Sequence, residues 1–131
     1  ADFLASRLFL RSALAPYTAL PPASLRFVTA PSGKPDLAPR AVAASWAHTR
    51  HLAVLAVAAP EIRRLGVDVE LWRGRELRSG AGRLEARLFR GEGEVQRLEG
   101  MGGEARRRAV FEGWTRKEAV LKATGVGIKE G

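Results

Sequence analysis

The sequence predicts an α+β fold, because helical and strand patterns occupy separate blocks of the chain. One helical pattern comes first, three strand patterns follow, and further helical patterns fill the C-terminal part. The chain has 131 residues, 46% of them hydrophobic, which suits one domain or slightly more around a packed core. It contains no cysteine, which excludes disulfide scaffolds, thiol catalysis and thiolate metal sites.

The first predicted helix covers residues 2–14. Apolar side chains form a stripe along it, at Leu4, Leu8, Phe9 and Leu14. Prolines follow at positions 16, 21 and 22, and we expect them to end the helix.

The three predicted strands cover residues 25–29, 52–58 and 65–71. The first alternates apolar and polar residues, as a half-buried strand does, and the second is an almost continuous apolar run. Residues 30–40 contain three prolines and a glycine, which predicts a loop. Residues 45–49 are expected to form an outward-facing turn.

The C-terminal part changes character. Residues 74–103 are rich in Gly, Arg and Glu, with short helical patterns at 83–89 and 94–98. Residues 104–123 carry the strongest helical pattern, in which we interpret Trp114 as a core residue. Gly125 stands where a glycine commonly ends a helix.

The net charge is +8, from 22 Lys and Arg against 14 Asp and Glu. A basic surface attracts polyanions, which include nucleic acids, acidic proteins and small ligands with several phosphates. Only 7% of the residues are aromatic, and the Trp and Phe residues follow apolar stripes rather than a basic face. This pattern argues against nucleic acid as the partner.

The apolar runs and the start of the chain indicate whether the protein carries a membrane span or a signal peptide. The longest apolar run, residues 52–60, is too short to span a bilayer, and we see no signal-peptide pattern. The chain starts at Ala1 rather than Met, so we expect that it begins inside a longer protein.

Two carboxylates lie two residues apart in Gly-Val-Asp-Val-Glu, residues 66–70. On a strand, Asp68 and Glu70 would share one face. Oxygen ligands without a nearby His or Cys favour Mg²⁺ or Mn²⁺ over zinc. The alternative is a strand face with solvated charges, and this motif alone does not decide between them.

The helix 104–123 carries a third carboxylate and two lysines. Glu118 and Lys122 are four residues apart, which suits an intrahelical ion pair. Alternatively, Glu118 is a metal ligand, and Lys117 and Lys122 lie near phosphate oxygens.

Possible anion-binding residues precede the carboxylates. His48 and Thr49 could hold a phosphate, or they could belong to a plain polar turn. Arg26 and the Gly-Lys-Pro loop around Lys34 offer further cations, although such short motifs are common by chance.

The order of these motifs is more specific than any one of them. An Arg-containing helix, Arg-Phe, Gly-Lys-Pro, Ser-Trp-Ala-His-Thr, Gly-Val-Asp-Val-Glu and Trp-Thr-Arg-Lys-Glu-Ala-Val-Leu-Lys follow one another along the chain. This succession resembles the Sfp-type 4′-phosphopantetheinyl transferases of the holo-acyl-carrier-protein synthase superfamily. The resemblance extends from about residue 7 to residue 128.

The resemblance implies two similar α+β halves related by a pseudo-twofold axis, with the active site between them. Residues 1–71 would form the first half, and residues 72–131 would begin a truncated second half, so that the unit is incomplete at both ends. It also implies an Mg²⁺-dependent transferase, with Mn²⁺ as a possible substitute. Such an enzyme moves the phosphopantetheine arm of coenzyme A to a carrier-protein serine and releases 3′,5′-ADP.

The resemblance also implies roles for particular residues. The metal ligands would be Asp68, Glu70 and Glu118. Glu118, or a water on the metal, would take the serine proton, and Lys122 or Lys117 would hold the diphosphate. The remaining phosphate site would comprise His48, Thr49, Lys34, Arg11 and Arg26.

The turn departs from the family pattern Asn-x-Ser-His-Ser or Thr. Ser45 replaces the Asn, and Ala47 replaces the first Ser. Loss of that hydroxyl is expected to weaken coenzyme A binding by about 1–2 kcal/mol.

The expected partners are coenzyme A and an acidic acyl or peptidyl carrier protein of fatty acid, polyketide or nonribosomal peptide biosynthesis. No nucleic acid or membrane partner is expected. The full-length protein would be a cytoplasmic monomer. The alternative is a basic module that binds nucleic acid or a carrier protein without catalysis.

Overall fold

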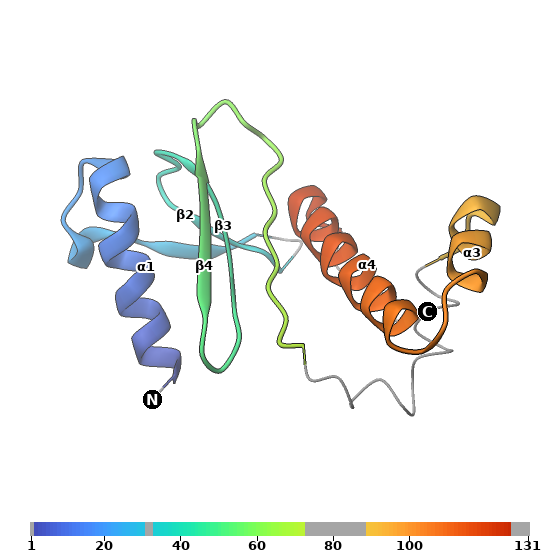
Figure 1. The fold of residues 1–131 in the computed structure, drawn as a ribbon. Helices are drawn as coiled ribbons and strands as arrows, with labels where there is room; N and C mark the ends of the chain where they lie inside the picture. The colour runs from blue at the N-terminus through green and yellow to red at the C-terminus, as the bar shows by residue number, and fades with distance from the viewer. Residues whose placement is uncertain (1, 31–32, 73–88, 127–131) are drawn as a thin grey trace. The chain divides into compact units, whose positions relative to one another are not determined.

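The computed structural model describes residues 2–30, 33–72 and 89–126 (Figure 1). It confirms the α+β class for these residues, with helices and short antiparallel strands. The chain forms two compact units: the first unit comprises residues 1–69 and 118–131, and the second unit comprises residues 70–117. None of the described helices is both long and apolar enough to cross a membrane.

Helix α1 covers Asp2–Thr18 and is longer than predicted. It continues through Pro16, because this proline lies in the last turn on an exposed face. The carbonyl of Ser12, which loses its hydrogen-bond donor to the proline ring, is on the same exposed face and can be hydrated.

The apolar stripe predicted for α1 is wrong in part. Among the side chains of residues 4–18, Leu10, Leu14 and Thr18 are buried, and they repeat every four residues along one face. The exposed side chains include Leu4, Leu8 and Phe9. Only Leu14 of the predicted stripe is in the core.

Strands β1 (Phe27–Thr29) and β2 (Pro35–Leu37) form an antiparallel hairpin in which Phe27 pairs with Leu37. The prediction of a loop throughout residues 30–40 is therefore wrong. Pro35 is tolerated because it is the first residue of its strand. Gly33 has a φ of +80°, which permits the turn between the strands.

Strands β3 (Ala43–His48) and β4 (Ala53–Ala58) form a second antiparallel hairpin, and β4 confirms the strand predicted at 52–58. The turn predicted at 45–49 is instead mostly strand. The reversal comes after His48, where the Thr49 hydroxyl oxygen accepts hydrogen bonds from the backbone N–H groups of His51 and Leu52. This local arrangement caps the turn without a glycine.

The core of the first unit lies between α1 and the two hairpins. Trp46 on β3 packs edge-on to Phe27 on β1, with ring centroids 5.5 Å apart. Trp46 pairs with Leu55 across the β3–β4 hairpin, so both side chains contribute to the same face. The buried core residues are Leu14, Leu25, Leu37, Val42 and Ala44.

Residues 65–71 do not form the predicted strand. Side chains bind two of the backbone groups in this segment. The Lys34 ammonium donates to the carbonyl of Leu65 at 2.7 Å, and the N–H of Val67 donates to the Ser45 hydroxyl at 3.1 Å. The segment therefore takes a defined path without a ladder.

Helices α3 (Glu92–Glu99) and α4 (Gly103–Thr124) confirm the predictions for residues 94–98 and 104–123. Gly125 has a φ of +71°, and its N–H donates to the Leu121 carbonyl, as predicted for a helix stop. The helical pattern predicted at 83–89 lies outside the described residues, apart from Phe89.

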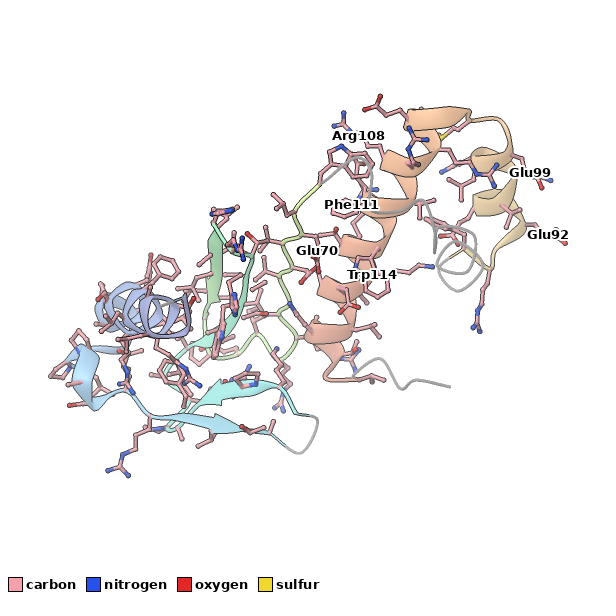
Figure 2. All side chains as sticks on the ribbon, turned by 90° about the horizontal axis from the view of Figure 1, so that it is seen from below. Glu70, Glu92, Glu99, Arg108, Phe111 and Trp114 are labelled. Carbon is pink, nitrogen blue, oxygen red and sulfur yellow. The ribbon has the colours of Figure 1, made fainter. Side chains whose placement is uncertain are left out.

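The second unit has its own small core. Leu98 of α3 and Val110 of α4 are buried, and Trp114 packs against them, which confirms its assignment to the core. Phe111 meets Trp72 edge-on with ring centroids 5.0 Å apart. Figure 2 shows Glu92 and Glu99 projecting outward from α3, whereas Phe111 and Trp114 lie along α4.

Candidate functional site

The carboxylate segment packs directly on the C-terminal part of α4, within the first unit. Gly66 makes this contact possible. A Cβ atom at position 66 would overlap the Ala119 carbonyl oxygen and would lie 2.6 Å from the Ala123 nitrogen. The two backbones approach so closely that only glycine fits between them.

This close approach brings Asp68 to Lys122. The Lys122 Nζ donates to Asp68 Oδ1 at 2.6 Å, although the two residues are 54 positions apart. The Asp68 side chain is only 5% exposed, and that of Lys122 is 34% exposed. Hydrogen bonds between two charged groups in such a partly buried position are short and strong.

Only one oxygen of the Asp68 carboxylate is satisfied in this way. Asp68 Oδ2 is buried and has no hydrogen-bond partner among the described residues. A buried acceptor without a partner is costly, and native proteins rarely leave one. Such an atom is suited to a ligand that the protein binds, and a cation is the ligand that a carboxylate oxygen prefers.

Glu118 lies one helical turn before Lys122 on α4, so the two residues share one face of the helix. Asp68, Glu118 and Lys122 therefore belong to one region of the first unit. Glu70 is exposed and is the first residue of the second unit. Among the described residues, no three His, Cys, Asp or Glu side chains form a group that could hold a metal ion.

Lys117 belongs to the second unit and has an aromatic neighbour. Its Nζ lies 5.2 Å from the centroid of the Phe89 ring, within the range of a cation–π interaction. The same ring packs against Gly113, where a Cβ atom would collide with it.

Lys34 makes a hydrogen bond within the first unit. Its ammonium donates to the Leu65 carbonyl, three residues before Asp68. Burial lowers the pKa of Lys34 from its ordinary value of 10.5. The nearby Asp36 carboxylate acts in the opposite direction, and Arg40 lowers the pKa further.

Arg11 also binds groups of the first unit, namely backbone carbonyls and an aromatic ring. Its Nη1 donates to the carbonyls of Pro22 and Leu25 at 2.8 and 2.7 Å, and its guanidinium lies over the Phe27 ring at 5.3 Å. It thereby holds the short 3₁₀ helix η1 (Pro22–Ser24) against α1. Arg26 is exposed.

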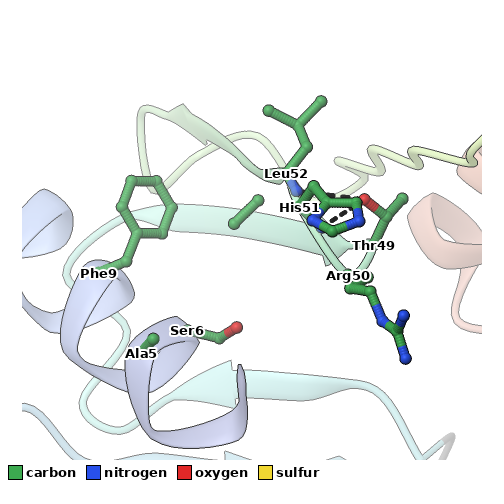
Figure 3. Close-up of a pocket in the computed structure, with 8 residues that line it drawn as sticks. Ala5, Ser6, Phe9, Thr49, Arg50, His51 and Leu52 are labelled. Atoms are coloured by element: carbon green, nitrogen blue, oxygen red, sulfur yellow. Dashed lines mark hydrogen bonds between the residues drawn. The ribbon is translucent and has the colours of Figure 1, made fainter. Parts of the chain in front are cut away.

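His48 and Thr49 end β3 and begin its turn. The His48 side chain is exposed. Thr49 lines a shallow depression of about 300 Å³ between the N-terminal half of α1 and residues 49–53 (Figure 3). Ser6 and Phe9 line its other side, and Arg50 and His51 add cationic or titratable groups.

Sequence reasoning gave Ser45 no role beyond a departure from a family pattern. The structure buries it and bonds it to the backbone beside Asp68. A single hydroxyl among the small and apolar residues 41–47 was the signal that could have identified it.

Comparisons with known proteins identify a family and two relatives with similar sequences. The sequence model of the 4′-phosphopantetheinyl transferase superfamily matches residues 64–131, a range that includes Asp68, Glu118 and Lys122. The chain is 36% identical to the provisionally named 4′-phosphopantetheinyl transferase slr0495 of Synechocystis, over 98% of this chain and 51% of that protein. It is 35% identical to the 4′-phosphopantetheinyl transferase HetI of Nostoc, over 96% of this chain and 52% of that protein.

The chain spans about half the length of these curated relatives. Its similarity to them covers both the hairpins of the first unit and the whole of α4. The match to the superfamily includes slightly more than half of its residues, with the paired Asp68 and Lys122 among them. This chain is therefore a member of the 4′-phosphopantetheinyl transferase superfamily.

Proposed function

We propose that the protein transfers the 4′-phosphopantetheine arm of coenzyme A to a serine of a carrier protein, in a reaction that requires Mg²⁺. Membership of the superfamily supports this activity. The observation that carries the proposal is the buried Asp68 carboxylate, which has one oxygen paired with Lys122 and the other without a partner.

The proposed metal ligands are Asp68, Glu118 and Glu70. Asp68 Oδ2 fits this role because it is buried without a hydrogen-bond partner in the described residues. An all-oxygen set of a few carboxylates is what Mg²⁺ accepts, since this ion keeps waters and substrate phosphates as its other ligands. When bound, Mg²⁺ would neutralise charge on the diphosphate of coenzyme A.

The described side chains divide the remaining work. Lys122 holds Asp68 through Oδ1, which orients Oδ2. Lys117 and the exposed part of Lys122 are the proposed cations for the phosphate oxygens. Glu118 is the proposed base for the carrier serine.

The proposed reaction forms one bond and breaks one bond. The serine oxygen attacks the phosphorus that bears the pantetheine arm and loses its proton to Glu118. The bond from that phosphorus to the bridging oxygen breaks, and 3′,5′-ADP leaves with the electron pair. No nucleophile from this chain is needed.

The proposed site for the 3′-phosphate centres on His48 and Thr49, with Arg26 as a further exposed cation. The depression beside Thr49 supports this placement. Arg11 and Lys34 already donate to backbone carbonyls, so we propose that they contribute mainly by holding the fold around the phosphate site.

The proposed partner is an acidic acyl or peptidyl carrier protein of fatty acid, polyketide or nonribosomal peptide biosynthesis. The net charge of +8 favours an acidic surface over a basic one. Arg108 and Arg116 on α4 both pair with the single carboxylate of Glu112. A cytoplasmic monomer without a nucleic-acid partner is proposed on the family resemblance alone.

The test is transfer to an apo carrier protein, followed by mass spectrometry of the carrier. Wild-type protein with coenzyme A and Mg²⁺ should add one phosphopantetheine arm, and a chelator should stop the reaction. Asp68→Asn should abolish transfer. Asp36→Asn, which alters a carboxylate outside the proposed site, should leave it unchanged. Undiminished transfer by Asp68→Asn would refute the assignment.

A further inference from the structure

Ser45 is a buried polar residue in a strand of small and apolar side chains. It lies in β3 and is 2% exposed. It pairs with Ala56 of β4. Ala44, which precedes it, and Ala47, which lies two residues after it, are also buried. A hydroxyl in such a place needs a hydrogen bond, because burying it without one costs free energy.

The partner of Ser45 is the backbone of the carboxylate segment. The N–H of Val67 donates to Ser45 Oγ at 3.1 Å. Residues 65–69 belong to no strand and have no backbone ladder. The bond to Ser45 therefore takes the place of a strand-to-strand hydrogen bond. Val67 immediately precedes Asp68, so a rotation of the Gly66–Val67 peptide that carries this N–H would shift the carboxylate.

Three consecutive residues before Asp68 are each held by a different element. The Leu65 carbonyl accepts from Lys34, Gly66 lies against the backbone of α4, and the Val67 N–H donates to Ser45. The first two contacts fix where the segment lies. The third fixes the orientation of the Gly66–Val67 peptide plane, one peptide before Asp68.

We propose that Ser45 is a positioning residue for the metal-binding carboxylate of Asp68, and that it acts through the Val67 N–H. This inference rests on the proposed metal site. Partners that orient a ligand from outside the metal's own shell typically change metal affinity by about 10–100-fold when they are removed. A purely structural serine would change stability but not the affinity of the folded protein for metal.

The experiment compares Ser45→Ala with wild type in two measurements on folded protein. Hydrogen exchange of the Val67 amide, measured by NMR without metal, reports the bond itself. Titration with Mn²⁺, followed by the loss of the free-ion EPR signal, reports the metal site. We expect Ser45→Ala to speed Val67 exchange and to weaken Mn²⁺ binding by roughly 10-fold or more.

Further variants keep the result interpretable. Ser45→Thr retains the hydroxyl and should restore both readouts toward wild type. Ser45→Cys keeps the size but offers a weaker acceptor, so it should give an intermediate loss, and it serves if Ser45→Ala does not fold. Ser24→Ala, at an exposed serine in η1, is the matched control and should behave as wild type.

Two results separate failure of this inference from failure of the proposed function. If Ser45→Ala exposes the Val67 amide but binds Mn²⁺ as wild type does, the positioning role is wrong and the metal site stands. If Asp68→Asn also binds Mn²⁺ as tightly as wild type, the metal site itself is wrong, and the positioning role fails with it.

Discussion

Substitution of Gly66 by alanine tests the packing that brings Asp68 to α4. The added Cβ would overlap the Ala119 carbonyl oxygen, and it would lie 2.6 Å from the Ala123 nitrogen and 3.0 Å from the Ala119 carbonyl carbon. All three atoms belong to helix backbone, which cannot rotate away as a side chain can. The segment or the helix must therefore move.

The expected cost is at the upper end of the range for overpacked sites. Overpacking typically destabilises by 1–3 kcal/mol, so we expect a loss of about 3 kcal/mol for Gly66→Ala. Alanine also restricts the unfolded chain, which returns about 0.4–1 kcal/mol. The net loss of about 2 kcal/mol corresponds to a roughly 30-fold shift in the unfolding equilibrium.

Urea denaturation followed by circular dichroism measures this loss. Gly93→Ala is the matched control, because Gly93 lies in α3 and a Cβ atom there would meet nothing within 4 Å. Since alanine is the better helix former, Gly93→Ala should be stabilising by about 0.5–1 kcal/mol. A Gly66→Ala protein as stable as wild type would refute the close packing of residues 65–69 on α4.

Three further predictions follow from the described contacts. Gly113→Ala should destabilise by about 1 kcal/mol in the same urea assay, because the Phe89 ring that it meets can shift and because alanine is the better helix former. Lys122→Met should destabilise by about 2 kcal/mol, since it leaves the buried Asp68 carboxylate unpaired, and a second change to Asp68→Asn should recover most of the loss in a double-mutant cycle. The lowered pKa of Lys34 means that the unfolded chain binds more protons below pH 10.5, so this residue should make stability rise as the pH approaches that value. Lys34→Met should flatten that rise in urea titrations at increasing pH, and an unchanged slope would contradict the burial of the ammonium.

The elements predicted correctly are those that local sequence determines. Helix α4 follows from apolar spacing over many residues, and Gly125 marks its end because a φ of +71° suits glycine. The errors come from tertiary context. Strand β2 was missed because Pro35 and its neighbours suggested a loop, although a proline at the start of a strand is compatible with pairing.

In the candidate site too, the important residues could be predicted from the sequence, whereas their tertiary contacts could not. The sequence indicated Asp68, Glu118 and Lys122 as chemically important, and the spacing of Glu118 and Lys122 suggested an ion pair within the helix. The structure pairs Lys122 with Asp68, 54 residues away, and no local pattern contains that information. Likewise, nothing in Arg11 itself indicates that three backbone carbonyls will accept from it.

The most direct test of the central claim is calorimetric titration of coenzyme A into the protein, with and without Mg²⁺. Wild type and Asp36→Asn should bind coenzyme A more tightly when Mg²⁺ is present, and Asp68→Asn should lose this dependence, because Asp68 Oδ2 is proposed to hold the ion against the diphosphate. An Asp68→Asn protein that still binds coenzyme A in the same Mg²⁺-dependent way would contradict the assignment of Asp68 as a metal ligand.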